Sequence, residues 1–172
     1  MQRVLSRFLL VLSLLTALLG GLTAGAASAA DTVPYHIFNN ATGGSLLPYG
    51  YGSDSSDGIL MYVWNPGFTA GGDEWTFEDV GGSYLIRNTR TGKCLKPGGP
   101  WYGKTYVTQG ACNTGLEFQW GLQVRGSDGA YKITSRSSHQ VMTPYYGTAL
   151  GEVVVLEPDS GVTKNWWSIT PV

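Results

Sequence analysis

Apolar and polar residues alternate in short segments along this chain, and one such segment occurs three times. The copies span residues 35–48, 84–97 and 131–144 and align without a gap. Each copy begins with tyrosine, has isoleucine two positions later and ends with proline. Recurrence at a period of roughly 45–50 residues indicates a repeat architecture, so the fold has to be interpreted as three related units.

Each copy begins with a period-two segment, in which Tyr84 and Ile86, for example, share one face. Period two predicts a β-strand whose two apolar side chains point to a common core. A polar turn and a second short strand follow, which together predict a hairpin. The predicted turns are residues 39–43, 88–92 and 135–139, and the second strands are 46–47, 94–96 and 141–142.

Two further strands are predicted in each unit. The third strands are residues 59–64, 106–109 and 153–156, and each fourth strand is centred on a tryptophan, namely Trp75, Trp120 or Trp167. An apolar residue lies two positions beyond each tryptophan, on the same face of the strand. We therefore expect these three indoles to be core residues.

A helical repeat is the alternative, because helix pairs also recur at such periods. The apolar spacing is two rather than three or four, and Gly and Pro interrupt the longer segments, which excludes helices. Three hairpin-rich units would bury their apolar faces most simply by closing on themselves. The predicted fold is all-β, a single β-trefoil of three four-stranded repeats with pseudo-threefold symmetry.

The first residues have the pattern of an export signal. Arg3 and Arg7 precede an apolar run over residues 8–19, and small residues follow up to Ala29. This predicts a signal peptide over residues 1–29, a secreted extracellular protein, and a trefoil domain over 30–172 with lobes at about 33–80, 81–128 and 129–172. The run is shorter than the ~20 residues of a membrane span. An uncleaved N-terminal anchor is the alternative.

Charge and composition exclude several classes of partner. The chain holds 11 Lys and Arg against 12 Asp and Glu, and two of the basic residues lie in the leader. No basic cluster remains to attract nucleic acid or an anionic membrane, so neither is predicted as a partner. The chain also has 25 Gly, 10 Tyr and 6 Trp, which is typical of short strands joined by tight turns.

Cys94 and Cys112 are the only cysteines. In an exported protein we expect them to form a disulfide rather than two free thiols. Two sulfurs without a nearby histidine cannot complete a tetrahedral zinc site, so no metal is predicted. No phosphate-binding loop or nucleophile motif occurs either, and no cofactor is predicted.

The middle unit contains Gly92-Lys93-Cys94-Leu95, a glycine pair at 98–99, Cys112-Asn113 and a final Trp120. These residues resemble the motifs of the ricin-B-type lectin trefoils, including the glycine loop of that family. The resemblance spans the chain beyond the leader and is strongest in the middle unit. It implies a β-trefoil fold and carbohydrate binding.

In that family a lobe binds sugar through an Asp just after the Cys-Leu pair, an aromatic residue on the third strand and an Asn. The carboxylate accepts hydrogen bonds from sugar hydroxyls, and the ring covers the apolar C–H face. Leu47, Lys96 and Thr143 occupy the three Asp positions here. The resemblance therefore implies degenerate sugar sites, and we expect simple galactosides to bind weakly or not at all.

Two sets of residues are candidates for ligand binding. The first matches the family's aromatic and amide positions, at Trp64, Asn65 and Asn113. The second set recurs in the loop after the second strand of every unit, as Tyr49 and Tyr51, Trp101 and Tyr102, and Tyr145 and Tyr146. Exposed aromatic rings favour protein interfaces and sugar stacking alike. Alternatively, these rings fold back over their lobes as half-buried packing.

A second resemblance within the same fold is to the A and C subunits of bacterial cytolethal distending toxins. These are ricin-like trefoils with aromatic surface patches and without intact sugar sites, which implies an alternative role as a non-catalytic toxin-like subunit or protein-interaction module.

No enzyme is predicted. His36 and His139 are expected to be solvated, and Glu152 and Glu157 lie five apart on one predicted strand, so they face opposite sides and cannot act as an acid/base pair.

The sequence thus predicts a secreted monomer that binds a glycan or a glycoprotein surface, and alternatively a partner protein subunit. Asn40-Ala41-Thr42 matches the N-glycosylation acceptor pattern. Use of Asn40 would depend on the source organism.

Overall fold

The computed structural model describes residues 33–172, so the predicted signal peptide lies outside the described residues. This part of the chain contains short strands and 3₁₀ turns and no α-helix. Four consecutive strands form one lobe, so that β1–β4, β5–β8 and β9–β12 are lobes 1, 2 and 3. The strands are β1 (Tyr35–Asn39), β2 (Ser45–Pro48), β3 (Met61–Trp64), β4 (Glu74–Asp79), β5 (Tyr84–Asn88), β6 (Cys94–Trp101), β7 (Lys104–Gly110), β8 (Trp120–Val124), β9 (Tyr131–Ser135), β10 (Val141–Pro144), β11 (Val154–Glu157) and β12 (Trp167–Pro171).

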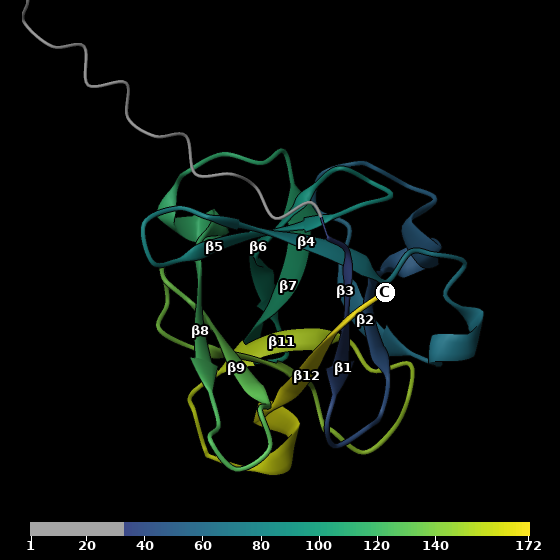
Figure 1. The fold of residues 1–172 in the computed structure, drawn as a ribbon. Helices are drawn as coiled ribbons and strands as arrows, with labels where there is room; N and C mark the ends of the chain where they lie inside the picture. Colours follow the sequence, from purple (N-terminus) through teal and green to yellow (C-terminus); the bar gives the residue numbers. More distant parts are fainter. Residues whose placement is uncertain (1–32) are drawn as a thin grey trace, which may run out of the picture.

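The first and last strands of the lobes form a barrel. Strands β1, β4, β5, β8, β9 and β12 pair antiparallel in a closed ring, and β12 lies beside β1 where the ring closes (Figure 1). Closure satisfies the backbone N–H and C=O groups that an open sheet would leave at its edges. The barrel therefore needs no charged residues to protect an edge.

The second and third strands of each lobe form a hairpin, and the three hairpins contact one another. Strand β7 pairs with β11, Leu60 bridges Thr108, and Tyr62 bridges Val153. These contacts join lobe 2 to lobe 3, lobe 1 to lobe 2 and lobe 1 to lobe 3. A barrel with one hairpin from each lobe is the β-trefoil architecture, so the predicted fold is confirmed.

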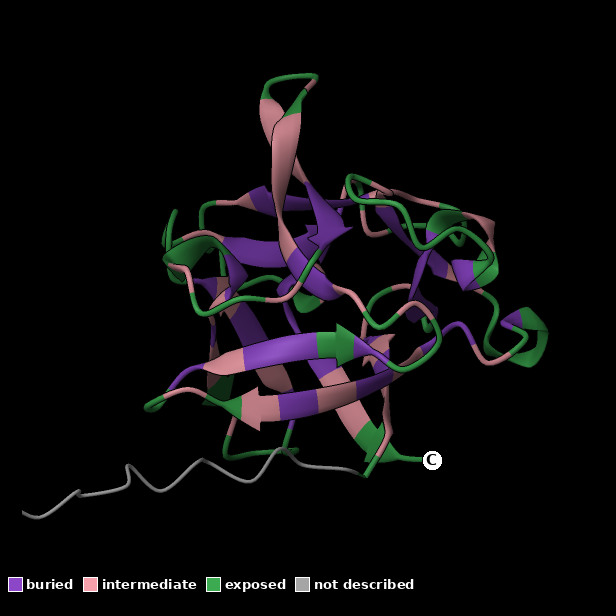
Figure 2. Cartoon of the chain, turned by 90° about the horizontal axis from the view of Figure 1, so that it is seen from above, coloured by how far each residue is buried: buried purple, intermediate pink, exposed green. Residues whose placement is uncertain are grey.

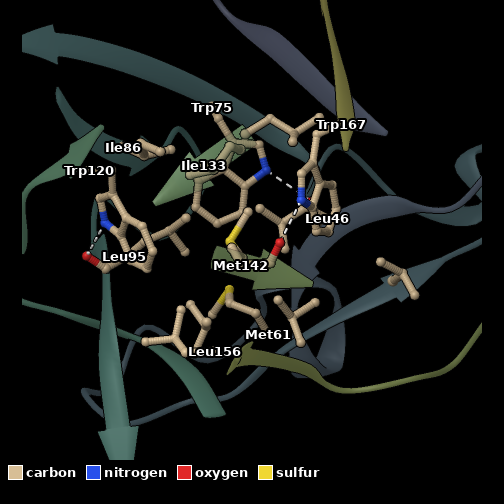
Figure 3. Close-up of a cluster of buried hydrophobic side chains, with 14 of the residues drawn as sticks. Leu46, Met61, Trp75, Ile86, Leu95, Trp120, Ile133, Met142, Leu156 and Trp167 are labelled. Atoms are coloured by element: carbon tan, nitrogen blue, oxygen red, sulfur yellow. Dashed lines mark hydrogen bonds between the residues drawn. The ribbon is translucent and has the colours of Figure 1, made fainter. Parts of the chain in front are cut away.

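Trp75, Trp120 and Trp167 lie in the core and are fully buried (Figure 3). Each indole Nε1 donates a hydrogen bond to a backbone carbonyl of the second strand in its own lobe. The acceptors are Leu46 O at 2.9 Å, Leu95 O at 3.1 Å and Met142 O at 2.9 Å. A large ring can be buried at little cost when its only polar group has a partner. The prediction that the three tryptophans are core residues is confirmed.

A buried polar side chain fixes the turn after the first strand. In lobe 2 the Nδ2 of Asn88 donates to Gly72 O at 2.8 Å, and its Oδ1 accepts from the backbone N–H of Thr91 at 3.0 Å. Asn39 makes the same kind of contacts in lobe 1, with Lys164 O as the acceptor. Each amide shapes its own turn and also ties it to a neighbouring lobe.

The largest difference from the predicted strands is in lobe 2. The sequence predicts a second strand that ends at Lys96 and a glycine loop at 98–99, but β6 continues to Trp101. A Cβ atom on Gly98 would lie 2.5 Å from the Tyr106 ring, so the glycine lets the backbone pass close to a side chain on the paired strand. The hairpin β6–β7 is therefore long, and it projects from the body with an exposed tip (Figure 2).

Cys94 and Cys112 form the predicted disulfide, which crosslinks lobe 2 across a separation of 18 residues. It joins the beginning of β6 to the segment before a 3₁₀ turn at Leu116–Phe118. Cys94 packs with Leu85 and Phe118 in a small cluster beside the main core. The crosslink thus fixes the base of the projecting hairpin.

Candidate functional site

The three positions at which the lectin family carries an aspartate differ from one another in this structure. Leu47 is fully buried in the core. Lys96 places its ammonium 5.4 Å from the centre of the Phe118 ring. Thr143 is fully buried and donates its hydroxyl to Lys164 O at 2.9 Å. No lobe therefore presents a carboxylate at this position.

The tip of the β6–β7 hairpin carries two neighbouring aromatic residues. Trp101 and Lys104 pair across the turn, and Tyr102 and Gly103 supply its two left-handed residues, with φ of 45° and 79°. The ring centres of Trp101 and Tyr102 are 5.6 Å apart. Tyr102 is 79% exposed, whereas Trp101 is half-buried. The indole is shielded because it contacts the next lobe.

Tyr145 and Tyr146 lie in the loop between β10 and β11, and Glu152 holds that loop in shape. Its Oε2 accepts hydrogen bonds from the backbone N–H groups of Tyr146 at 2.9 Å and Gly147 at 2.6 Å. Its Oε1 accepts from the N–H groups of Thr148 and Ala149 and from the Thr148 hydroxyl. Burial acts to raise the pKa of Glu152, but these backbone donors outweigh it and lower the pKa. Both oxygens are occupied by the protein itself.

Two lysines from different lobes hold the backbone of Tyr145. Lys104 and Lys164 donate to Tyr145 O at 3.2 and 3.1 Å. Both ammonium groups also lie 2.8 Å from a carboxylate oxygen of Glu157. Burial acts to raise the pKa of Glu157, but the two lysines outweigh it and hold the pKa below its ordinary value. Lys104 further lies 4.2 Å from the centre of the Tyr145 ring.

The rings of lobes 2 and 3 meet around a partly open hollow of about 350 Å³, which we call the inter-lobe pocket. The centres of Trp101 and Tyr145 are 6.0 Å apart, and those of Tyr145 and Tyr146 are 4.6 Å apart at nearly a right angle. Tyr102 completes the aromatic wall. The rest of the wall consists of Gly151, Glu152 and Val153.

The aromatic residues of lobe 1 form a separate group. The Tyr49 ring lies 5.8 Å from that of Tyr62, Tyr62 lies 5.9 Å from Trp64, and Trp64 lies 6.5 Å from Tyr51. These rings have no direct ring contact with Trp101 or the rings around it among those that the structure shows. The predicted loop aromatics therefore divide into the inter-lobe pocket and the group on lobe 1.

The two asparagines predicted as polar anchors are engaged in local turns. Asn65 Oδ1 accepts from the N–H of Gly67 at 3.1 Å and begins a 3₁₀ turn at Pro66–Phe68. Asn113 Oδ1 accepts from the N–H of Gly115 at 2.8 Å. Both residues are exposed, but their side-chain carbonyl oxygens already have a partner. The structure brings neither asparagine to the inter-lobe pocket.

The remaining chemistry of the described chain is limited. His139 is exposed as expected, whereas His36 is only partly exposed and its Nδ1 lies 3.1 Å from the buried carboxylate of Asp73. Within residues 33–172, no group of three or more His, Cys, Asp or Glu side chains is placed to hold a metal ion. No helix in that part has the length and apolar character that a membrane crossing requires.

Comparison with solved structures finds the same fold in proteins of several kinds. ThreeFoil, a designed threefold-symmetric protein, has a TM-score of 0.73 at 23% identity, with 81% of this chain and 99% of that chain covered. An exo-β-1,3-galactanase from Clostridium thermocellum has a TM-score of 0.73 at 23% identity, and the match covers 83% of this chain but only 31% of the enzyme. The Haemophilus ducreyi cytolethal distending toxin has a TM-score of 0.65 at 17% identity, covering 80% of this chain and 83% of that chain. Likeness at these identities shows the fold alone.

Comparison at the level of sequence identifies the family. No curated protein matches the chain. Residues 71–157, which are about half of the chain and run from just before β4 to the end of β11, match the family model described as ricin-type β-trefoil lectin domain-like. The closed barrel, the three hairpins and the three buried tryptophans agree with that match. The chain therefore belongs to the ricin-type β-trefoil lectin-like family.

Proposed function

We propose that this protein binds carbohydrate in the inter-lobe pocket and catalyses no reaction there. The observation that carries the proposal is the hollow of about 350 Å³ walled by Trp101, Tyr102, Tyr145 and Tyr146. Such rings cover the C–H face of a sugar, and phenol hydroxyls can exchange hydrogen bonds with sugar hydroxyls. The volume lies in the range of small-molecule sites.

The site would work differently from the aspartate-based sites of the family. Glu152 lines the pocket, but both of its oxygens accept hydrogen bonds from its own loop. Recognition would therefore depend on ring stacking rather than on a carboxylate fork. For this reason we expect simple galactosides to bind weakly or not at all.

The ionisation of two carboxylates supports a role without catalysis. Glu152 lines the pocket, and Glu157 pairs with the two lysines that contact Tyr145 O. The protein holds the pKa values of both carboxylates below the ordinary value. A general acid at neutral pH needs the opposite shift. We further propose that the protein is secreted, which the leader sequence and the disulfide support, and that it acts as a monomer.

Protein binding is the second candidate function, as a non-catalytic, toxin-subunit-like module. The observation in its favour is the exposure of Tyr102 and Tyr146, at 79% and 71%, beside a hollow. Exposed tyrosines next to a pocket also anchor protein interfaces. Both candidate functions would use the same rings, so they can be distinguished only by identifying the ligand.

A glycan array probed with the oxidised chain lacking residues 1–29 tests the proposal. The variants Trp101→Ala and Tyr146→Ala should lose binding, because each removes a wall of the pocket. Tyr146→Phe keeps the ring and should retain most of it. Leu116→Ala is the matched control, since Leu116 is 60% exposed and lies outside the pocket.

Binding that survives both alanine variants would place the site elsewhere and refute the inter-lobe pocket. A silent array combined with capture of a defined partner protein, lost in Trp101→Ala, would replace carbohydrate by protein as the ligand. Circular dichroism of each variant shows whether the fold is intact before binding is compared.

A further inference from the structure

The aromatic residues of lobe 1 form a surface next to the inter-lobe pocket. Tyr49 is 65% exposed and Tyr51 is 38% exposed, while Trp64 is half-buried between them and the loop of lobe 3. Tyr62 lies beneath this surface. Burial raises the pKa of Tyr62 to about 12, with the phenols of Tyr51 and Tyr49 adding to the effect, so this ring stays neutral. Lobe 1 thus presents aromatic and uncharged rings.

Two contacts place the lobe 1 rings next to the pocket wall. Tyr62 bridges Val153, and Val153 is part of the pocket wall. Gly151 is also part of that wall, and a Cβ atom there would lie 3.3 Å from the Trp64 ring. The N–H of Gly151 donates to Val63 O at 2.7 Å, which fixes this spacing.

Gly151 therefore occupies the junction between the two groups of rings. It is exposed and left-handed, with φ of 85°, and it carries no side chain that would stand between Trp64 and the pocket. We use the name aromatic band for the resulting surface. It consists of the pocket rings Trp101, Tyr102, Tyr145 and Tyr146 and the lobe 1 rings Tyr49, Tyr51 and Trp64.

The charged side chains at the pocket cancel one another. Glu152 lines the pocket and carries negative charge, while Lys104 and Lys164 contact Tyr145 O and carry positive charge. Glu157, which pairs with both lysines, adds a second negative charge. The Glu152 carboxylate is surrounded by backbone donors. A ligand in the pocket therefore meets no net charge, which gives an ionic ligand no advantage over a neutral one.

The pocket is also small. Its volume of about 350 Å³ lies near the lower end of the range for ligand sites. A single sugar unit bound in this pocket would bury little surface area by itself. A longer ligand would gain further stacking by leaving the pocket past Gly151 and continuing over the rings of lobe 1.

We propose that the ligand is an uncharged oligosaccharide chain that lies along the aromatic band, with one sugar unit in the pocket and the following units on Trp64 and the lobe 1 tyrosines. This inference rests on the proposed function and adds a second contact region on lobe 1. The ligand class is thus a neutral glycan chain rather than a single terminal sugar or an acidic glycan.

Calorimetry with ladders of neutral β-linked gluco- and galacto-oligosaccharides, from one to six units, tests the inference. Affinity should rise about tenfold or more between one and three or four units and then level off. A ladder of galacturonic acid oligomers of the same lengths should bind more weakly at each length. The control Leu116→Ala should leave the whole profile unchanged.

Variants at the two ends of the band separate this inference from the proposed function. Tyr49→Ala and Trp64→Ala should flatten the dependence on length, and Tyr49→Ala serves where loss of the half-buried Trp64 disturbs the fold. If affinity does not depend on length, or both variants keep the wild-type profile, the lobe 1 contact is refuted while pocket binding stands. If Trp101→Ala leaves every affinity unchanged, the proposed function fails as well. Silence of all ladders would overturn the inference whatever the array shows.

Discussion

The barrel core and the hairpin surface make different use of the same threefold repeat. In the core, Trp75, Trp120 and Trp167 are buried alike and make the same hydrogen bond in each lobe. On the hairpins, equivalent positions have different environments, and Lys96 is half-exposed where Leu47 is buried. The threefold repeat is preserved in the core, where each lobe has to make the same packing contacts. The hairpin surface is unequal, and the aromatic rings of the inter-lobe pocket come from lobes 2 and 3.

Replacing a tryptophan by alanine, once in the core and once on the hairpin surface, should give the largest difference in stability and tests the comparison directly. Trp120→Ala should cost about 3–5 kcal/mol of unfolding free energy, because it leaves a large cavity and an unpaired Leu95 carbonyl. Trp101→Ala should cost less than about 1 kcal/mol while it abolishes binding, since Trp101 lies at a hairpin tip. Urea unfolding measures both values. Equal losses would show that the pocket rings also support the fold.

The disulfide allows a second test, of intermediate size, because it lies at the base of the pocket hairpin. The double variant Cys94→Ala, Cys112→Ala should lose about 3 kcal/mol, the chain-entropy value for a loop of 18 residues. At a temperature where the barrel remains folded, it should still bind the ligand, since the rings are positioned by contacts with lobe 3. Thermal unfolding with and without reductant gives the stability. Loss of binding in the folded variant would show that the crosslink positions Trp101.

Acid should have the smallest effect, and it acts on the surface rather than on the core. The folded pKa of Glu152 lies below its ordinary value of 4.5. Its ionised form therefore stabilises the fold above that value, and this contribution is lost as the pH falls through the folded pKa. The melting temperature of the wild type should fall on acidification below pH 4.5, and Glu152→Gln should show a smaller fall. Glu117→Gln, at an exposed position, should follow the wild type.

The fold could be predicted from the sequence because its determinants are local and occur three times. Period-two strands, a tryptophan in each fourth strand and a single cysteine pair are visible without knowing how the lobes meet. The exception was the glycine pair at 98–99, which indicated a loop and instead lies within β6. Only the position of Tyr106 on the paired strand shows why glycine is needed there.

The candidate site could be predicted only in part. The sequence identified the rings, but not that those of lobes 2 and 3 come together. Lys104 and Glu157 are 53 residues apart and meet only when two hairpins dock, so no local pattern could reveal the pair. Tyr62 could have been found, because it lies two positions before Trp64 on one strand. The turn roles of Asn65 and Asn113 were also accessible, since each precedes a glycine by two residues.

The inter-lobe position of the pocket links ligand binding to the folding equilibrium. Walls contributed by two lobes exist only when the trefoil is closed, so an isolated lobe would have no site and unfolded chains would not compete for ligand. A ligand that binds only the closed form raises its stability by RT ln(1 + [L]/Kd), or about 2.7 kcal/mol at a hundredfold excess over Kd. The sugar would then act as a reversible crosslink between lobes 2 and 3, and a rise in melting temperature would report its binding without any label.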